Sequence, residues 1–322
     1  MKAKETAAAL ENEVSKVIIG KAQQIKLITM AVFSGGHVLL DDLPGSGKTT
    51  LIKAFSKALG CSFGRVQFTP DLLPSDILGM TIYDRKTDEF RLVKGPVFTN
   101  ILLADEINRA IPRTQSALLE AMEERQVTID NSSLKLPEPF FVMATQNPVE
   151  RESTFELPAA QMDRFFVRLS LGFPTREEEQ QMLSSTSDRF SDEDINVVSS
   201  PADLIEIGKE IDNVFVSDNV MKYIVELVHA TRECDCLKAG GSPRASRFLL
   251  RGGKTYAAIM GRDYVIPEDI AEIFLPVLAH RVVLTNEAKY TKKTAEEILT
   301  ELLASVPVPP TGEGIFNGEK AR

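Results

Sequence analysis

Apolar residues in the first half of the chain form short runs that are bounded by turn residues and apolar on both faces. Such runs are typical of buried strands in a parallel sheet covered by helices. The predicted strands are residues 37–42, 64–68, 100–106, 140–147 and 164–171. Helical spacing appears between them, for example at 49–59 and 113–124. The pattern predicts an α/β fold, a three-layer αβα domain with a parallel sheet.

After residue 172 the pattern changes to one helix start after another. Thr175 and Glu178 have the spacing of a capping box, and Ser-Pro pairs at 200–201 and 242–243 place a cap before a first-turn proline. Further helix starts are expected at Pro267 and Thr294. The sequence therefore predicts an αβα core over 1–175, a smaller all-α domain over 176–310 and a flexible tail over 311–322.

The segment after the first predicted strand, residues 42–49, reads DLPGSGKT. A strand, a glycine-rich loop and a helix in this order form the context of a phosphate-binding loop. Glycines 45 and 47 let backbone amides turn toward a phosphate, Lys48 would reach the β- and γ-phosphates, and the Thr49 hydroxyl would bind Mg²⁺. The predicted nucleotide-binding residues here are Pro44, Gly45, Ser46, Gly47, Lys48, Thr49 and Thr50.

One position departs from the usual phosphate-loop pattern. Asp42 stands where G-x-x-x-x-G-K-[ST] has its first glycine. Because Asp42 ends the strand before the amides that would hold the anion, its side chain need not approach the phosphate. The substitution is therefore expected to be compatible with nucleotide binding.

Polar residues at the ends of two other predicted strands supply the remaining chemistry. Asp105 and Glu106 follow an apolar strand, where ligands bind in open α/β sheets. Asp105 is expected to hold Mg²⁺, and Glu106 to orient and deprotonate an attacking water. Asn147 ends the next strand and could bond the γ-phosphate or that water. Taken alone, polar residues at a strand end would be interpreted as part of a solvated turn. Together with the glycine-rich loop, these residues predict an ATPase site.

Composition limits the partners and the compartment. The chain has 322 residues, 43% of them hydrophobic and 26% charged, with a net charge of −9 and three cysteines. An acidic balance disfavours broad nucleic-acid binding, and no apolar run has the length of a membrane span. With no signal-peptide pattern and no disulfide framework, the expected location is the cytoplasm.

Several blocks together resemble the MoxR family of AAA+ ATPases, over about residues 14–309. They are LLDDLPGSGKT (39–49), FTPDLLPSDILG (68–79), KGPVFTNILLADEINRA (94–110), QSALLEAMEERQVTI (115–129), ATQNP (144–148), LPAAQMDRF (157–165) and SPRAS (242–246). The resemblance implies a hairpin between residues 129 and 140 and an insertion near 68–98. Family members often have Glu where this chain has Ala160, a position outside the inferred phosphate contacts.

The resemblance also implies roles for single residues. Asn147 matches the sensor-1 position and Arg244 the sensor-2 position on the helical lid. Arg164 matches the arginine finger, which in AAA+ rings reaches a neighbouring subunit's γ-phosphate. The residues that match the adenine-pocket segment are Ile18, Ile19 and Gly20. Without the family, Arg164 and Arg244 would be interpreted as surface cations.

The function implied by the resemblance is ATP hydrolysis with Mg²⁺ that powers chaperone-like remodelling, assembly or activation of partner proteins. The expected assembly is a homo-oligomeric ring, a hexamer, and the expected partner a protein with a von Willebrand A domain. Within the same class of ATPases, the nearest alternative is a magnesium-chelatase-like subunit. Two other hypotheses stay open, a nucleic-acid motor and a nucleotide-gated binding module without turnover. A small-molecule kinase is disfavoured, since the lid motifs belong to ring ATPases.

Overall fold

The computed structural model describes residues 1–42, 45–130, 132–147, 154–184 and 195–309. By its contacts the chain divides into two compact units, Met1–Asp212 and Asn213–Arg322. Pro44 and the predicted tail at 311–322 lie outside the described residues. In the described part, no helix is both long and apolar enough to cross a membrane.

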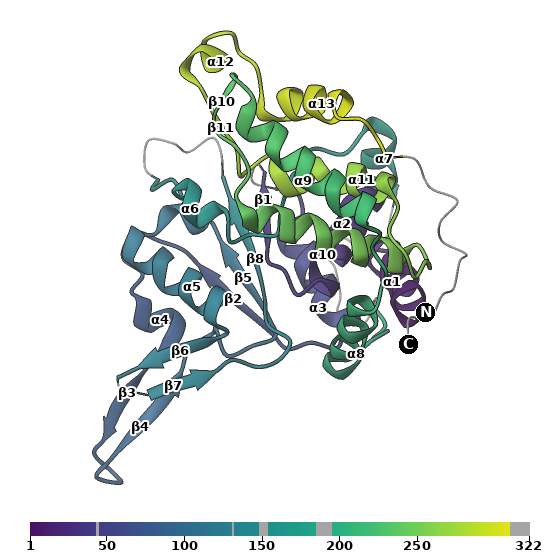
Figure 1. The fold of residues 1–322 in the computed structure, drawn as a ribbon. Helices are drawn as coiled ribbons and strands as arrows, with labels where there is room; N and C mark the ends of the chain where they lie inside the picture. Colours follow the sequence, from purple (N-terminus) through teal and green to yellow (C-terminus); the bar gives the residue numbers. More distant parts are fainter. Residues whose placement is uncertain (43–44, 131, 148–153, 185–194, 310–322) are drawn as a thin grey trace, which may run out of the picture. The chain divides into compact units, whose positions relative to one another are not determined.

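The first unit is built on a five-stranded parallel sheet with the strand order β2-β5-β8-β1-β9 (Figure 1). Its strands are β1 (Val38–Asp41), β2 (Phe63–Gln67), β5 (Ile101–Asp105), β8 (Phe141–Gln146) and β9 (Val167–Leu169). Each of the five apolar runs overlaps one of them, so the predicted parallel sheet is confirmed. Strand β5 is buried along its whole length, as expected for a strand covered on both faces.

The register of the sheet brings four strand ends to one edge. Asp41 of β1 pairs with Gln146 of β8, and Gln67 of β2 pairs with Asp105 of β5. In a parallel sheet the carboxyl ends of all strands point the same way. The segments that follow these strands therefore emerge together, and they include the glycine-rich loop.

Helices and a buried apolar cluster complete the first unit. Residues of β5, β8 and α5 share this cluster, among them Leu102, Ala104, Val142, Ala144, Leu118 and Leu119. The helical elements of the unit are α1 (Lys2–Val14), α2 (Ala22–Phe33), α3 (Lys48–Ala58), α4 (Pro74–Leu78), the 3₁₀ turn η1 (Ile107–Arg109), α5 (Pro112–Glu124), α6 (Ala159–Met162), α7 (Arg176–Ser184) and α8 (Pro201–Asp212).

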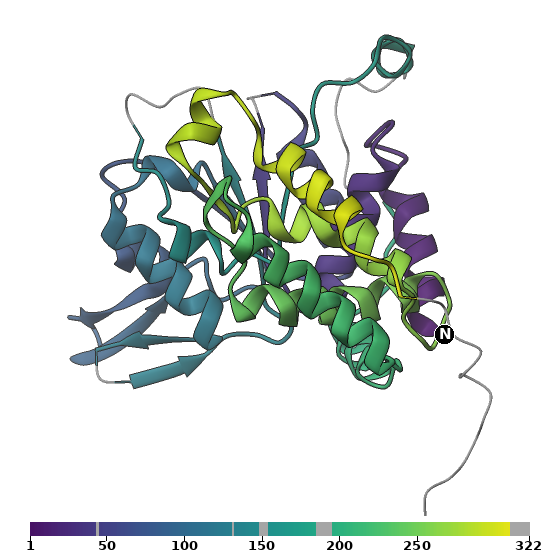
Figure 2. The same ribbon diagram turned by 45° about the horizontal axis from the view of Figure 1, so that its top comes forward.

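Two antiparallel hairpins lie apart from the main sheet. Strands β3 (Gly79–Asp84) and β4 (Glu89–Lys94) form one, and β6 (Gln126–Ile129) and β7 (Ser132–Lys135) form the other. They lie side by side in both views (Figures 1 and 2). The hairpin expected between residues 129 and 140 begins earlier, because its first strand β6 lies at 126–129 and only β7 falls in the expected stretch. The segment expected to be an insertion folds as α4 and the β3–β4 hairpin.

The first compact unit extends beyond the boundary expected at residues 175–176. Helix α8 packs on α1 and α2 of the same unit, and Lys2 Nζ lies 2.6 Å from a carboxylate oxygen of Asp203. These contacts join segments about 200 residues apart, so the pattern of helix starts did not indicate them. Ser200 caps α8 as expected, accepting a hydrogen bond from Asp203 N at 3.2 Å.

The second unit is mostly helical, as predicted for this half of the chain. Thr294 and Glu297 form a reciprocal capping box at the start of α13. The elements are α9 (Asp218–Glu233), β10 (Leu237–Ala239), α10 (Pro243–Ile259), α11 (Pro267–Leu278), β11 (Val283–Leu284), α12 (Asn286–Tyr290) and α13 (Ala295–Ser305). The short antiparallel pair β10–β11 was not expected.

Candidate nucleotide-binding site

The glycine-rich loop runs from the end of β1 to the start of α3. Gly45 and Gly47 have φ angles of +82° and +83°, a left-handed conformation that glycine adopts without strain. Gly47 is the N-cap of α3 and has no side chain with which to cap the helix start. The first amide groups of α3 are therefore arranged as in an anion-binding helix N-terminus.

Asp42 and Lys48 are linked at the start of the loop. The Lys48 ammonium donates a hydrogen bond to the Asp42 carbonyl oxygen at 2.6 Å. Burial lowers the pKa of Lys48 below its usual 10.5, while the nearby carboxylates of Asp42 and Asp105 act in the opposite direction. Lys48 is thus a half-buried cation held at the base of the loop.

The Asp42 side chain explains the departure from the phosphate-loop pattern. It is buried and accepts three hydrogen bonds, from Ser170 Oγ at 2.7 Å, from Leu171 N at 2.7 Å and from Gly172 N at 3.0 Å. All three donors belong to the segment after β9. The carboxylate therefore fixes the chain that leaves β9 against the end of β1.

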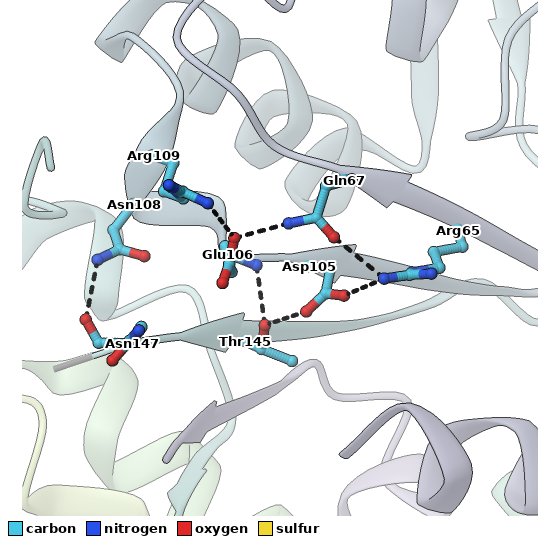
Figure 3. Close-up of polar contacts among 8 residues, drawn as sticks. All are labelled: Arg65, Gln67, Asp105, Glu106, Asn108, Arg109, Thr145 and Asn147. Atoms are coloured by element: carbon cyan, nitrogen blue, oxygen red, sulfur yellow. Dashed lines mark hydrogen bonds and ion pairs between the residues drawn. The ribbon is translucent and has the colours of Figure 1, made fainter. Parts of the chain in front are cut away.

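Asp105 and Glu106 lie in a network of polar side chains at the ends of β2, β5 and β8 (Figure 3). Asp105 Oδ2 accepts from Arg65 at 2.7 Å, and Asp105 Oδ1 accepts from the Thr145 hydroxyl at 2.7 Å. The same hydroxyl oxygen accepts from Glu106 N at 2.8 Å. Thr145 thus joins the two acidic residues to the neighbouring strand.

The Glu106 carboxylate is oriented by two donors. Its Oε2 accepts from Gln67 Nε2 at 2.7 Å and from an Arg109 terminal nitrogen at 2.9 Å (Figure 3). Glu106 also has a left-handed backbone, with φ +57°. A non-glycine residue in this conformation costs free energy and is common at functional sites. The strained backbone directs Glu106 away from the path of β5.

Asn147 follows β8 at the same edge and is buried. Its backbone oxygen accepts a hydrogen bond from Asn108 Nδ2 at 3.4 Å (Figure 3). This contact ties the end of β8 to the 3₁₀ turn after β5. The predicted sensor residue is therefore held beside the predicted acidic pair.

A cavity of about 470 Å³ brings these residues together. It is lined by Gly45, Ser46, Gly47, Lys48, Thr49, Thr50, Arg65, Gln67, Asp105, Glu106 and Asn147. Among the described residues Ser46 Oγ is buried with no hydrogen-bond partner, which suits a site that receives a polar ligand. The structure thus places nine residues of the sequence prediction around one cavity, together with Arg65 and Gln67.

The sequence reasoning missed four residues of the network, namely Arg65, Gln67, Arg109 and Thr145. Arg65 and Gln67 come from β2, whose place beside β5 is a result of the sheet order. Thr145 could have been suspected, since it immediately precedes the predicted polar strand end in ATQN. For Arg109, the only sequence feature that could have indicated the contact is its position three residues after Glu106.

Three other predicted positions lie outside this cavity lining. Arg164 follows α6 and pairs with Glu123 of α5, with Nε and a carboxylate oxygen 2.7 Å apart. Arg244 is in the first turn of α10, in the second unit. The segment 18–20 lies between α1 and α2, next to Lys21, whose ammonium donates to Phe173 O at 3.1 Å.

The available oxygen donors fit Mg²⁺. Thr49 offers a hydroxyl and Asp105 a carboxylate in the same cavity, and Mg²⁺ favours one or two such protein ligands, with phosphate and water completing its octahedron. Asp105 Oδ2 is paired with Arg65. A bound Mg²⁺ would therefore compete with the Arg65 guanidinium for this carboxylate.

Known proteins resemble the chain in both units. Residues 37–167 match the ATPase family associated with various cellular activities (AAA), and residues 229–302 match the AAA lid domain. A putative ATPase from Cytophaga hutchinsonii has a similar crystal structure, with a TM-score of 0.88 and 39% sequence identity over 96% of this chain and 97% of that one.

Sequence relatives cover almost all of the chain. The uncharacterized protein YeaC of Bacillus subtilis is 47% identical over 92% of this chain and 92% of its own. The chaperone MoxR1 of Mycobacterium tuberculosis is 40% identical over 92% of this chain and 81% of its own. With the site geometry and both matched domains, these relatives show that the chain belongs to the MoxR family of AAA+ ATPases.

Proposed function

We propose that this protein hydrolyses ATP with Mg²⁺ and uses the energy to remodel, assemble or activate partner proteins, as a chaperone in the cytoplasm. The observation that carries the proposal is the single cavity that joins the phosphate-loop lysine, the two acidic residues after β5 and Asn147. The relative from Mycobacterium tuberculosis named as a chaperone supports the cellular role.

Each residue has a distinct part in the proposed reaction. Lys48 exchanges the Asp42 carbonyl for the β- and γ-phosphates, and the amides of the loop surround the same anion. Thr49 and Asp105 would hold Mg²⁺, which when bound would supply positive charge near the phosphates. Glu106 takes the proton of the attacking water through Oε1, since Gln67 and Arg109 engage Oε2.

Two substitutions separate binding from hydrolysis. Lys48→Ala removes the cation that pairs with the phosphates, so isothermal titration should show ATP affinity lower by at least about tenfold. Glu106→Gln keeps the size and polarity of the side chain but removes the base, so ATP should bind normally and persist unhydrolysed. Wild-type affinity in the first variant or wild-type turnover in the second would refute the assignment.

The proposed active unit is a homo-oligomeric ring, a hexamer, in which Arg164 completes the neighbour's site and Arg244 couples the lid to the nucleotide. The residues proposed to contact adenine are Ile18, Ile19 and Gly20, and Pro44 belongs to the proposed phosphate loop. An arginine finger contributes about 10³–10⁵ in rate. Arg164→Ala should therefore bind ATP and hydrolyse it very slowly.

Mixing experiments test whether Arg164 acts in trans. A co-assembled mixture of Arg164→Ala and Lys48→Ala subunits should regain activity, because an intact loop of one meets an intact arginine of the other. Native mass spectrometry would establish that both subunits share one assembly. Absence of rescue in such an assembly would contradict the trans role.

The proposed client is a protein with a von Willebrand A domain, and a gene for one beside this gene would support it. The alternative of a nucleic-acid motor makes a different prediction. DNA or RNA should stimulate the ATPase of a nucleic-acid motor, whereas a chaperone should respond to its client protein. The net charge of −9 favours the chaperone.

A further inference from the structure

The arginine expected to act as a finger is already held by a neighbouring side chain. Arg164 Nε donates a hydrogen bond to Glu123 Oε2 at 2.7 Å, and an Arg164 terminal nitrogen donates to the Ala160 backbone oxygen at 3.3 Å. Glu123 belongs to the last turn of α5, and Arg164 follows α6. The pair thus fixes the arginine between two helices.

The geometry leaves the guanidinium able to bind a second acceptor. A guanidinium has five N–H donors in a rigid plane, and its two terminal nitrogens carry four of them. Glu123 engages the Nε edge, so N–H groups at the far end can still reach a phosphate. An arginine fixed through Nε also searches fewer rotamers before it contacts an acceptor.

The surroundings of the pair are open and acidic. A surface cavity of about 300 Å³ has three glutamates of α5 in its lining, which consists of Ser116, Leu119, Glu120, Glu123, Glu124, Gln161 and Arg164. The side chains of Arg164 and Glu123 remain 29% and 36% exposed. An ion pair this exposed contributes at most about 1 kcal/mol to folding, so its main effect should be on the direction of the arginine.

We propose that Glu123 is a positioning residue, which holds Arg164 in the orientation needed to reach the nucleotide of the neighbouring subunit. The inference rests on the proposed function, in which Arg164 acts in trans. Glu123 itself contacts neither nucleotide nor water in this scheme. Its role is to lower the number of conformations that the arginine must search.

Steady-state kinetics of three variants test the proposal. Glu123→Ala should lower kcat on the order of tenfold with KM unchanged, because misplacing a group that acts in the transition state slows the step without weakening ATP binding. Glu123→Gln should retain most of the activity, since its amide oxygen can accept from Arg164 Nε. Glu124→Ala, in the same cavity, is the matched control and should behave as wild type.

Two mixtures of variants test whether Glu123 acts on the nucleotide of its own subunit or on that of the neighbouring subunit. Glu123→Ala with Lys48→Ala should regain activity, because the Lys48→Ala subunit brings an intact Glu123–Arg164 pair to the neighbour's intact loop. Glu123→Ala with Arg164→Ala should regain none beyond the sum of the two, since both lack a working finger. A general folding defect would not produce this pattern, and the melting temperature should stay within about 4 °C of wild type.

These experiments test the trans role of Arg164 and the positioning role of Glu123 separately. If Arg164→Ala and Lys48→Ala co-assemble without rescue, the trans finger itself is wrong. If that pair is rescued but Glu123→Ala keeps the wild-type kcat, or gains activity, the positioning role is wrong and the proposed ATPase stands. Loss of kcat in Glu123→Ala that Lys48→Ala subunits do not rescue would also overturn the positioning role.

Discussion

His37, a buried histidine immediately before β1, makes the stability of the first unit depend on pH. His37 Nδ1 accepts a hydrogen bond from Val142 N at 2.9 Å, and His37 Nε2 lies 3.1 Å from the Met122 carbonyl oxygen, to which it must donate. A neutral imidazole satisfies both contacts, whereas a protonated ring loses the first. Burial lowers the pKa of His37 from 6.5 to about 3, and the nearby positive charge of Arg125 adds to the effect.

The sign and size of the effect follow from these values. Below pH 6.5 the unfolded chain takes up a proton at His37 that the folded chain does not bind until about pH 3. Stability is therefore complete above pH 6.5 and is lost as the pH falls, by about 1.4 kcal/mol per pH unit. Between pH 6.5 and pH 5 the loss should be about 1.6 kcal/mol, a factor of about 16 in the folding equilibrium.

Native-state hydrogen exchange measures this loss where it occurs. Peptides from β1 and β8, corrected for the intrinsic effect of pH on exchange, report the opening free energy of the first unit. His37→Asn, which does not titrate, should remove about 1.6 kcal/mol of the difference between pH 6.5 and pH 5. His229→Asn, at an exposed histidine of α9, is the control and should leave it unchanged. The same pH dependence in wild type and His37→Asn would refute the reasoning.

Three further substitutions probe the candidate site. Asp42→Asn should lower the free energy of unfolding by about 1–3 kcal/mol in urea titrations, because the amide nitrogen that replaces one carboxylate oxygen cannot accept, so at least one of the three donors loses its acceptor. Arg65→Gln should lower the Mg²⁺ concentration for half-maximal ATPase by up to about fivefold, since it frees Asp105 from a half-exposed ion pair; an unchanged Mg²⁺ titration would remove Arg65 from the metal argument. Thr145→Val should lower both kcat and stability, because it leaves the Glu106 N–H without its acceptor, and Thr145→Ser should restore both.

Local sequence signals predicted the elements and the chemistry of the site. Apolar runs predicted all five strands of the sheet, most clearly β5 and β8, because a strand covered on both faces must be apolar throughout. The candidate phosphate loop was predicted from Gly45, Gly47 and Lys48, since the turn and the charge depend on adjacent residues. Capping boxes at Thr175 and Thr294 marked helix starts for the same reason.

The partners of these residues were decided by tertiary structure. Asp42 was expected only to avoid the phosphate, but the chain after β9 gives its carboxylate three donors. Arg65 and Gln67 join the site because β2 lies beside β5. The packing of α8 on α1 likewise extends the first unit to Asp212.

The sequence by itself therefore determined which residue types follow which strands, because hydrophobic period, turn conformation and helix capping are properties of neighbouring residues. The order of strands and the pairing of side chains from distant segments depend on how the whole chain packs. Glu123 shows the difference most clearly. In the sequence it is one of several glutamates on a polar helix face, and only the folded chain brings its carboxylate to Arg164.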